Sequence, residues 1–420
     1  MIARILLVGI GLLLVVAGAN LFDPYLFPIR RWAPVALPLG EAALLLWLAR
    51  RRWAVPAAVW AAALAAVLVA DAEFMLRKRA VLAENGAEAQ LLGRHFLVGY
   101  TRVEDVAPLA AKGLIGGIFV TRRNSGTKLR RDIAELQDLR RANGLPPLVV
   151  AADQEGGIVS HLSPLLPAMP PLADIAALPA AERADAARRY GYVQGRGLAS
   201  VGVSVNFSPV VDIKRDRLRW DVNSLIAKRA IAADPALVAE VAAAYAEGLR
   251  SAGVAPTLKH FPGLGRVQAD THHVRTRLGA SVEELEATDW LPFRQVLAGG
   301  QAQVMVGHTV VEAVDPDRPA SRSRKVVEGL IRQKWGFGGV VLTDDLTMPS
   351  VLHHGFCEAV TGALEAGVDL LLITYDGDQY YRAMECGLKA LRDGRLEPAM
   401  LRRDGSAGRA VERAAAAVRG

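Results

Sequence analysis

The sequence predicts an α/β fold in which a region of transmembrane helices precedes a (β/α) barrel. Three observations lead to this prediction. Short β-branched runs end in polar residues, helix-length segments rich in alanine and charge separate those runs, and the first eighty residues hold long stretches without charge. We therefore expect a membrane region over residues 1–80 and a globular barrel over residues 81–420.

Two apolar segments predict transmembrane helices. Ile5–Ala19 contains no polar side chain and Trp53–Ala70 contains no charge, and both approach the roughly 20 residues that cross a bilayer. Ala33–Ala49 is also apolar, but its interior holds residues that weaken a spanning helix, namely Pro34, Pro38, Gly40 and Glu41. The sequence thus predicts two to three spans.

The cations around these segments bear on orientation. A single Arg4 before the first span favours an N-terminus inside the cell. Three crossings of a bacterial inner membrane then place the large domain outside the cytoplasm. Alternatively, Arg4 and the small residues Ala17–Ala19 could mark a cleaved signal peptide, although the later segments would still hold the protein in the membrane.

Charge and cysteine content exclude several classes of protein. Of the net charge of +7, residues 1–80 contribute +5, and the barrel region has no basic stripe that would bind nucleic acid. The arginines that flank the apolar segments could instead contact anionic lipid of a bilayer. Cys357 and Cys386 can form at most one bridge, and no CxxC or Cys/His spacing indicates a metal site. We expect no cofactor, no metal and no nucleic-acid partner.

Four strands and three helices carry the barrel prediction. An open doubly wound sheet is the alternative, but it more often has a glycine-rich phosphate loop, and neither a complete dinucleotide fingerprint nor a P-loop is present. A barrel instead places its chemistry on the loops after the strands. The strands are expected at Leu148–Ala152, Val203–Phe207, Gly253–Leu258 and Gly338–Thr343, and the helices at Ala180–Ala199, Pro235–Ala252 and Val282–Ala298.

The segment after the third of these strands is the richest in reactive side chains. Lys259 and His260 are expected at the strand end, and Pro262 prevents a helix from continuing through the cluster. Asp270 and His272 follow on a loop, with one residue between them, where a carboxylate can orient an imidazole and raise its basicity. This segment therefore predicts a proton-transfer site.

Two acids end the fourth strand. Asp344 and Asp345 could simply favour a helix N-terminus, where carboxylates stabilise the dipole and cap the amides. We expect that structural role for Asp345. Because the strand delivers Asp344 to the loop end of the barrel, we expect Asp344 to take part in the chemistry.

The motifs together resemble glycoside hydrolase family 3, in its single-domain bacterial β-N-acetylglucosaminidase branch. The resemblance runs from about Leu91 to Ile373 and implies a TIM-type (β/α)8 barrel. Its motifs are His95–Tyr100, Gly116–Asn124, Asp153–Gly157, Asn206–Asp212, Lys259–Gly263, His308, Asp315–Ser321 and Thr343–Met348.

The resemblance also implies an activity. It implies a retaining hydrolase that releases terminal N-acetyl-β-D-glucosamine, from peptidoglycan fragments, through a covalent glycosyl-enzyme intermediate. Asp344 is then the nucleophile, and His272 with Asp270 replaces a carboxylic acid as the acid/base. The residues expected to bind the sugar are Asp153, His161, Arg229, Lys259 and His260.

This chain departs from the family in the sugar-binding loop. Ile158 and His161 stand where relatives usually carry arginines, which removes a bidentate donor. This departure motivates one alternative, a catalytically weak, membrane-tethered sugar-binding protein. A closer alternative is a β-glucosidase or a phosphorylase on the same barrel. The alanine-rich tail from Leu401 is expected to form a solvated helix.

Overall fold

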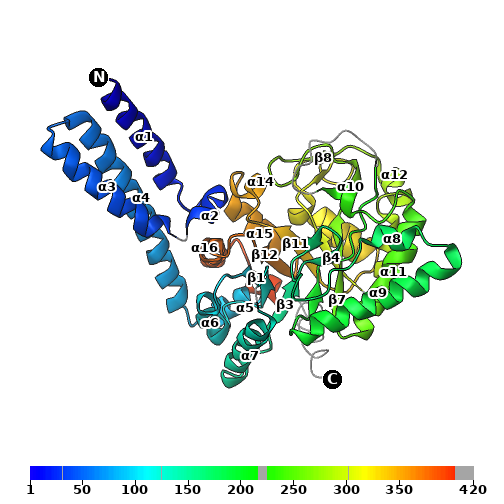
Figure 1. The fold of residues 1–420 in the computed structure, drawn as a ribbon. Helices are drawn as coiled ribbons and strands as arrows, with labels where there is room; N and C mark the ends of the chain where they lie inside the picture. The colour runs from blue at the N-terminus through cyan, green and yellow to red at the C-terminus, as the bar shows by residue number, and fades with distance from the viewer. Residues whose placement is uncertain (31, 124, 216–224, 301, 403–420) are drawn as a thin grey trace. The chain divides into compact units, whose positions relative to one another are not determined.

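A computed structural model describes residues 1–30, 32–123, 125–215, 225–300 and 302–402. The chain divides into two compact units, Met1–Glu84 and Asn85–Gly420 (Figure 1). Apart from Leu401 and Arg402, the predicted C-terminal helix lies outside the described residues, as do Asn124, Asn223 and Ser224.

The first unit consists of helices. All three apolar segments are helical, and three helices are long and apolar enough to cross a membrane by length and composition. These are α1 (Ile2–Ala19), α3 (Ala33–Arg50) and α4 (Ala54–Ala83), with the short α2 (Phe27–Arg30) between the first two. Pro38 lies inside α3 without ending it.

Glycines let α1 approach α4 closely. A Cβ at Gly11 would lie 2.7 Å from Val59, and one at Gly18 would lie 2.8 Å from Val67. The indole N–H of Trp60 donates to the carbonyl of Leu7 at 2.9 Å. Small residues at a helix contact are typical of membrane helices, where packing replaces the hydrophobic effect as the source of association.

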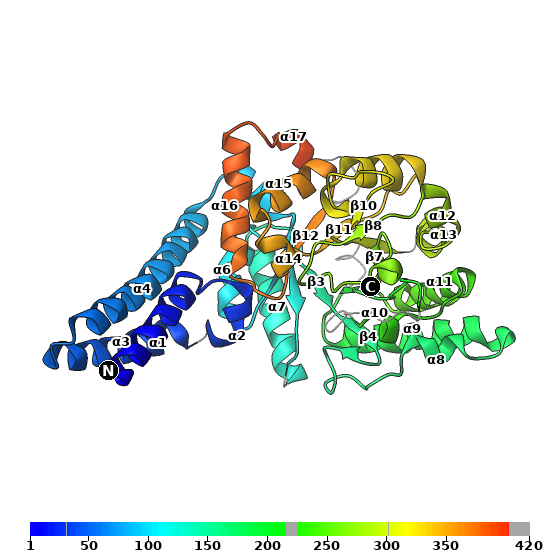
Figure 2. The same ribbon diagram turned by 90° about the horizontal axis from the view of Figure 1, so that it is seen from above.

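The second unit is built on a closed parallel barrel of eight strands, in the order β1-β12-β11-β9-β7-β6-β3-β2. The predicted barrel is therefore confirmed. Helices surround the strands in both views (Figures 1 and 2). The strands are β1 (Phe96–Gly99), β2 (Gly117–Val120), β3 (Val149–Ala152), β6 (Val205–Asn206), β7 (Ala255–Phe261), β9 (Gln303–Val306), β11 (Val341–Asp345) and β12 (Leu370–Ile373).

Alternate residues of the strands fill the barrel. Val149 and Ala151 of β3, and Leu370 and Leu372 of β12, belong to one buried cluster together with Phe119. The residues between them, such as Val150 and Leu371, are buried as well, beneath the surrounding helices. Because both faces of each strand are covered, the strands read as unbroken apolar runs in the sequence.

Thirteen α-helices lie in the described part of the second unit, and glycines permit α9 and α11 to approach closely. A Cβ at Gly191 of α9 would lie 2.2 Å from the Tyr245 carbonyl of α11. They are α5 (Ala87–Gly93), α6 (Val103–Lys112), α7 (Gly126–Ala142), α8 (Leu172–Ala176), α9 (Ala180–Ser200), α10 (Ile226–Arg229), α11 (Pro235–Ser251), α12 (Val282–Ala287), α13 (Leu291–Ala298), α14 (Pro349–Leu352), α15 (Phe356–Ala366), α16 (Gln379–Arg392) and α17 (Pro398–Leu401).

One helix prediction is wrong. The expected helix Val282–Ala298 is broken into α12 and α13 at Thr288–Trp290. Asp289 is fully buried there and accepts ion pairs from Arg215 and Arg266, at 3.0 and 2.7 Å. The chain therefore turns to bring Asp289 inward, and the alanine- and charge-rich composition gave no sign of this tertiary contact.

Two buried side chains in this unit, Arg140 and His95, each contact backbone carbonyls from separate segments of the chain. Arg140, 2% exposed, donates to the carbonyls of Pro146, Ala110 and Ile115 at 2.7 to 3.3 Å. Burial, with a contribution from Arg94, lowers the pKa of Arg140 to about 10, so it stays charged at neutral pH. The ring of His95, just before β1, contacts the carbonyls of Asp369 at 2.8 Å and Leu401 at 3.2 Å. 

The two cysteines form a disulfide. Cys357 on α15 and Cys386 on α16 are joined, with their Cα atoms 5.2 Å apart and a separation of 29 positions in sequence. The bridge links α15, which precedes β12, to α16, which follows it.

Candidate active site

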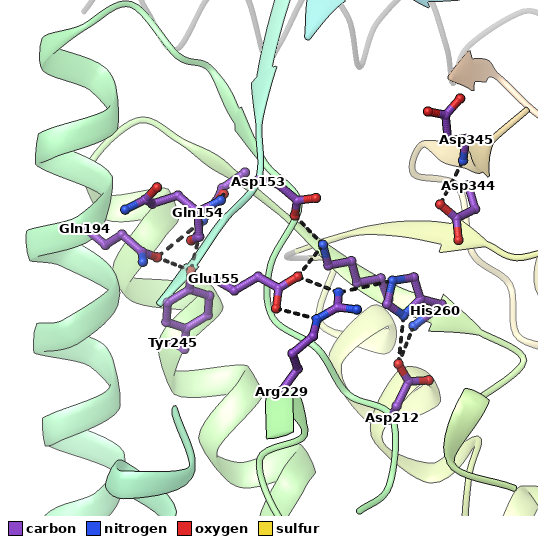
Figure 3. A network of polar contacts seen from close by, with 12 residues as sticks. Asp153, Gln154, Glu155, Gln194, Asp212, Arg229, Tyr245, His260, Asp344 and Asp345 are labelled. Atoms are coloured by element: carbon purple, nitrogen blue, oxygen red, sulfur yellow. Dashed lines mark hydrogen bonds and ion pairs between the residues drawn. The ribbon is translucent and has the colours of Figure 1, made fainter. Parts of the chain in front are cut away.

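Polar side chains meet at the carboxyl ends of the barrel strands. Asp153 directly follows β3, Lys259 and His260 are among the last residues of β7, and Asp344 is the second-last residue of β11. Because the strands are parallel, these ends lie on the same side of the barrel. Figure 3 shows Asp153, Glu155, Arg229 and His260 in one network of polar contacts, with Asp344 set apart from that network.

Lys259 and Arg229 are the cations of a buried ion-pair network. Lys259 is 1% exposed and its Nζ contacts Oδ1 of Asp153 and, at 2.6 Å, Oε1 of Glu155. Arg229 reaches Glu155 from α10 with two parallel bonds, Nη2 to Oε1 at 2.6 Å and Nε to Oε2 at 2.9 Å. Such fork-shaped pairing fixes both side chains in orientation.

The charge state of Glu155 follows from this network. Burial alone would raise the pKa of its carboxyl, but the adjacent charges of Arg229 and Lys259 lower that pKa well below its ordinary value. Asp153 is the most accessible member, with 22% of its side chain exposed. The network therefore presents one carboxylate toward the solvent side and keeps its cations engaged.

His260 is held by an acid from the neighbouring strand end. Asp212, fully buried after β6, accepts bonds from the backbone N–H of His260 at 3.1 Å, from its Nδ1 at 2.8 Å and from the Leu264 N–H at 2.6 Å. On the other side, His260 Nε2 lies 3.4 Å from Nη2 of Arg229. Since the guanidinium can only donate, Nδ1 carries the proton in the neutral tautomer that satisfies both contacts.

Asp344 lies among three imidazoles. Its Oδ1 accepts the backbone N–H of Asp345 at 2.8 Å. Burial raises the pKa of Asp344, but the protonated forms of His260, His308 and His272, together with that backbone bond, outweigh burial and lower the pKa below its ordinary value. Asp344 is therefore an anion over the physiological range of pH, as a carboxylate nucleophile has to be.

His272 and Asp270 form a hydrogen-bonded dyad. Oδ1 of Asp270 accepts from the backbone N–H of His272 at 3.0 Å and from its Nδ1 at 2.8 Å. The His272 side chain is 39% exposed, whereas that of Asp270 is 4% exposed. Ser350 at α14 fixes the loop, because its Oγ donates to the Thr271 carbonyl at 2.6 Å and its N–H to the His272 carbonyl at 3.0 Å. Nδ1 of His272 is thus engaged with Asp270, and Nε2 is the other ring nitrogen.

The expected position of Asp345 at a helix N-terminus is wrong, although its role is structural. β11 continues through Asp345, and the next helix, α14, begins only at Pro349. Its two carboxylate oxygens accept bonds at 2.7 to 3.2 Å from Thr347, Thr374 and the backbone of Tyr375. Asp345 therefore fastens the end of β11 to the end of β12.

His161 occupies the edge of the site. Its backbone N–H donates to the Asp153 carbonyl at 3.0 Å, and its ring stands edge-on to Phe119 with centroids 6.1 Å apart. The Nδ1 atom is buried, with no hydrogen-bond partner among the described residues. Ile158, two residues into the turn of the β4 (Gln154–Gly156) and β5 (Val159–Ser160) hairpin, is 54% exposed.

Three residues that contact the site had no role in the sequence-based prediction. Glu155 and Asp212 were present in the motifs but were not assigned, because sequence does not tell which acid pairs with which cation. His308 bonds Ser321 Oγ at 2.8 Å and the Asp345 carbonyl at 3.3 Å. Burial lowers the pKa of His308 despite the opposing effect of Asp344, so it is neutral.

Comparison with known proteins agrees with this geometry. Residues 89–403 match the family described as Glycosyl hydrolase family 3 N terminal domain. The chain belongs to this family. It is 32% identical over 311 residues to a beta-hexosaminidase of Nitrosomonas eutropha, an alignment that covers 72% of this chain and 86% of the relative. The chain is therefore a glycosidase of family 3.

Two solved structures share the fold. A family 3 beta-N-acetylglucosaminidase from Paenibacillus superimposes with a TM-score of 0.71 and 31% identity, over 78% of this chain and 62% of that one. This chain thus spans about three fifths of the Paenibacillus protein. A family 3 glycosyl hydrolase from Mycobacterium smegmatis gives a TM-score of 0.67 and 32% identity, covering 80% of this chain and 98% of its own.

Proposed function

We propose that this chain is a retaining β-N-acetylhexosaminidase that removes terminal N-acetyl-β-D-glucosamine from peptidoglycan fragments. The observation that carries the proposal is the pairing of an ionised Asp344 with the hydrogen-bonded dyad of His272 and Asp270. The names of the relatives in the same family support the choice of an amino sugar.

In the first step, a carboxylate oxygen of Asp344 attacks the anomeric carbon. The bond from that carbon to the aglycone oxygen breaks, and the oxygen takes a proton from Nε2 of His272. Asp270 favours the imidazolium that donates this proton, because its carboxylate lies 2.8 Å from Nδ1. The Asp345 N–H, 2.8 Å from Asp344 Oδ1, leaves Oδ2 to form the covalent bond.

In the second step, water hydrolyses the bond between Asp344 and the anomeric carbon. His272, now neutral, accepts a proton from the water through Nε2 as the oxygen attacks the anomeric carbon, and Asp344 leaves as a carboxylate. Two inversions give net retention. The 39% exposure of the His272 side chain suits a group that meets first a leaving oxygen and then water.

Asp153 is the residue that we assign to bind the sugar hydroxyls. Its carboxylate is the most accessible of the ion-pair network, and Lys259 fixes its orientation. Arg229 and Lys259 are both engaged with Glu155, so they act on the sugar chiefly by holding the acids in place. His260 and His161 border the same space, the latter with Nε2 as its remaining polar ring atom.

We also propose that the enzyme is an inner-membrane protein with three spans and its barrel outside the cytoplasm. The three apolar helices and the Cys357–Cys386 disulfide support this location, since disulfides persist in oxidising compartments. Protease added to intact spheroplasts is expected to digest the barrel. A barrel protected until the membrane is opened would contradict the orientation.

The decisive experiment for the activity is hydrolysis of a chromogenic N-acetyl-β-glucosaminide by the detergent-solubilised full chain. We expect turnover by the wild type, none by Asp344→Ala and greatly reduced turnover by His272→Ala. Parallel assays with β-glucosides, and with and without phosphate, test a β-glucosidase or a phosphorylase. Sugar binding without any turnover by the wild type would overturn the enzyme assignment in favour of a tethered binding protein.

A further inference from the structure

A carboxyl group lies at mid-length in the apolar helix α3. Glu41 is eight residues after Ala33 and nine before Arg50, the two ends of that helix. It is 2% exposed. Neither carboxylate oxygen has a hydrogen-bond partner in the part of the chain that the structure describes. Glu41 is therefore a buried titratable group that no step of the proposed reaction uses.

Among the described residues, the helices around α3 offer no counter-charge at this depth. α4, which packs against α3, has no charged side chain from Ala54 to Ala70, and its indole N–H at Trp60 is already donated to Leu7. Asp71 and Glu73 follow only in the later turns of α4. The short α2 contributes Arg30, whose guanidinium donates to carbonyls of residues 21 and 23 at 3.1 and 3.0 Å.

An ionised carboxylate in such surroundings is strongly disfavoured. It would lose its hydration without gaining an ion pair or hydrogen bonds, whereas the neutral acid has no net charge to bury. α3 also lacks one backbone hydrogen bond, because Pro38 has no N–H to donate.

We propose that Glu41 is a proton-binding site of the membrane unit, occupied at neutral pH, and that its deprotonation loosens α3 from α4. The ligand is a single proton, which the carboxyl exchanges with water. This inference rests on the proposed placement of the unit in a membrane. Its consequence is that the membrane unit, as well as the barrel, responds to pH.

Dicyclohexylcarbodiimide tests the protonation state directly, since it enters the bilayer and reacts with protonated carboxyls. We expect the full chain in proteoliposomes to be labelled at Glu41 at neutral pH, with labelling lost in Glu41→Gln and declining as the pH is raised. Glu73→Gln, which changes an exposed acid of α4, is the matched control and should leave labelling of the α3 peptide unchanged.

Several outcomes would overturn the inference. These are no labelling of Glu41 in an integral protein, labelling that survives at high pH, and labelling suppressed by sodium or potassium chloride, which would indicate a metal cation in place of the proton. Backbone hydrogen exchange supplies a second readout, because α3 should lose protection at alkaline pH in the wild type and keep it in Glu41→Gln. Alkaline carbonate extraction reports separately on membrane placement, so the two failures are distinguishable.

Discussion

The two sides of the active site handle buried charge in different ways. On one side, Lys259 and Arg229 form buried ion pairs with Asp153 and Glu155. On the other side, Asp344 has one oxygen bound to a backbone N–H and is surrounded by imidazoles. The first side balances fixed charges, and the second faces groups whose charge can change.

One side of the site therefore fixes the orientation of its side chains, and the other side carries the groups that can exchange protons. A network of permanent charges cannot exchange protons near neutral pH, but it holds Asp153 in one orientation. Imidazoles can carry or release a proton, so in the proposed mechanism they compensate Asp344 while it is an anion and adapt when it becomes an ester. Substitutions on the two sides should accordingly affect different measurements.

The largest effect is expected on the reactive side. Asp344→Asn should lower kcat on the order of 10⁵-fold, because it removes the nucleophile while keeping the shape. Asp345→Asn is the neighbouring control. It should lower the thermal unfolding temperature, since Asp345 joins two strand ends, but it should leave far more activity. Equal losses of kcat in the two variants, both folded, would contradict the assignment.

His272→Ala should reduce kcat/KM by roughly 10²- to 10⁴-fold on substrates with poor leaving groups. The loss should shrink for an aryl glycoside of an acidic phenol, because that leaving group departs without a proton. Steady-state kinetics on the two substrates tests this. A loss that is the same for both would mean that His272 positions the substrate and does not transfer a proton.

On the ion-paired side, Glu155→Gln should destabilise the fold by about 3–5 kcal/mol, because it leaves Lys259 and Arg229 partly unpaired in a buried site. The pKa of Glu155 is lower in the folded state than in the unfolded state. Its contribution is therefore complete above the unfolded pKa, about 4.3, and is lost as pH falls through the lower folded value. Denaturant unfolding should show a smaller dependence on acidic pH in Glu155→Gln than in the wild type.

The smallest effect is expected at the rim. Ile158→Arg changes a side chain that is 54% exposed, so the free energy of unfolding should move by no more than about 0.5 kcal/mol. A new guanidinium there should lower KM for an anionic muropeptide while kcat and the KM for a neutral aryl sugar stay the same. Unchanged KM for both substrates would place Ile158 outside the binding surface.

Much of the fold followed from local sequence. Strands such as Val149–Ala152 are buried on both faces and end in polar residues, which made them recognisable. The strands Gln303–Val306 and Leu370–Ile373 were not singled out, because a short apolar run cannot be told from part of a buried helix by periodicity. The alternating barrel-filling residues become evident only once the eight strands close.

The site was predictable where residues close in sequence act together. Asp270 and His272 are two positions apart, and the structure brings them into contact. The partner of His260 was not predictable, because Asp212 lies 48 residues earlier and meets it only through adjacent strands. Likewise, nothing local indicated that Glu155, rather than Asp153 alone, would pair with Lys259 and Arg229.

The ring of His95 has a practical consequence for engineering the enzyme. It contacts the carbonyl of Leu401, so the residue before the first barrel strand is joined to the last described helix. A shortened version that stops before α17 would expose that ring and the β1 end, and should express poorly. Tags and fusion partners are better attached beyond Arg402, because the contact between His95 and Leu401 is then kept.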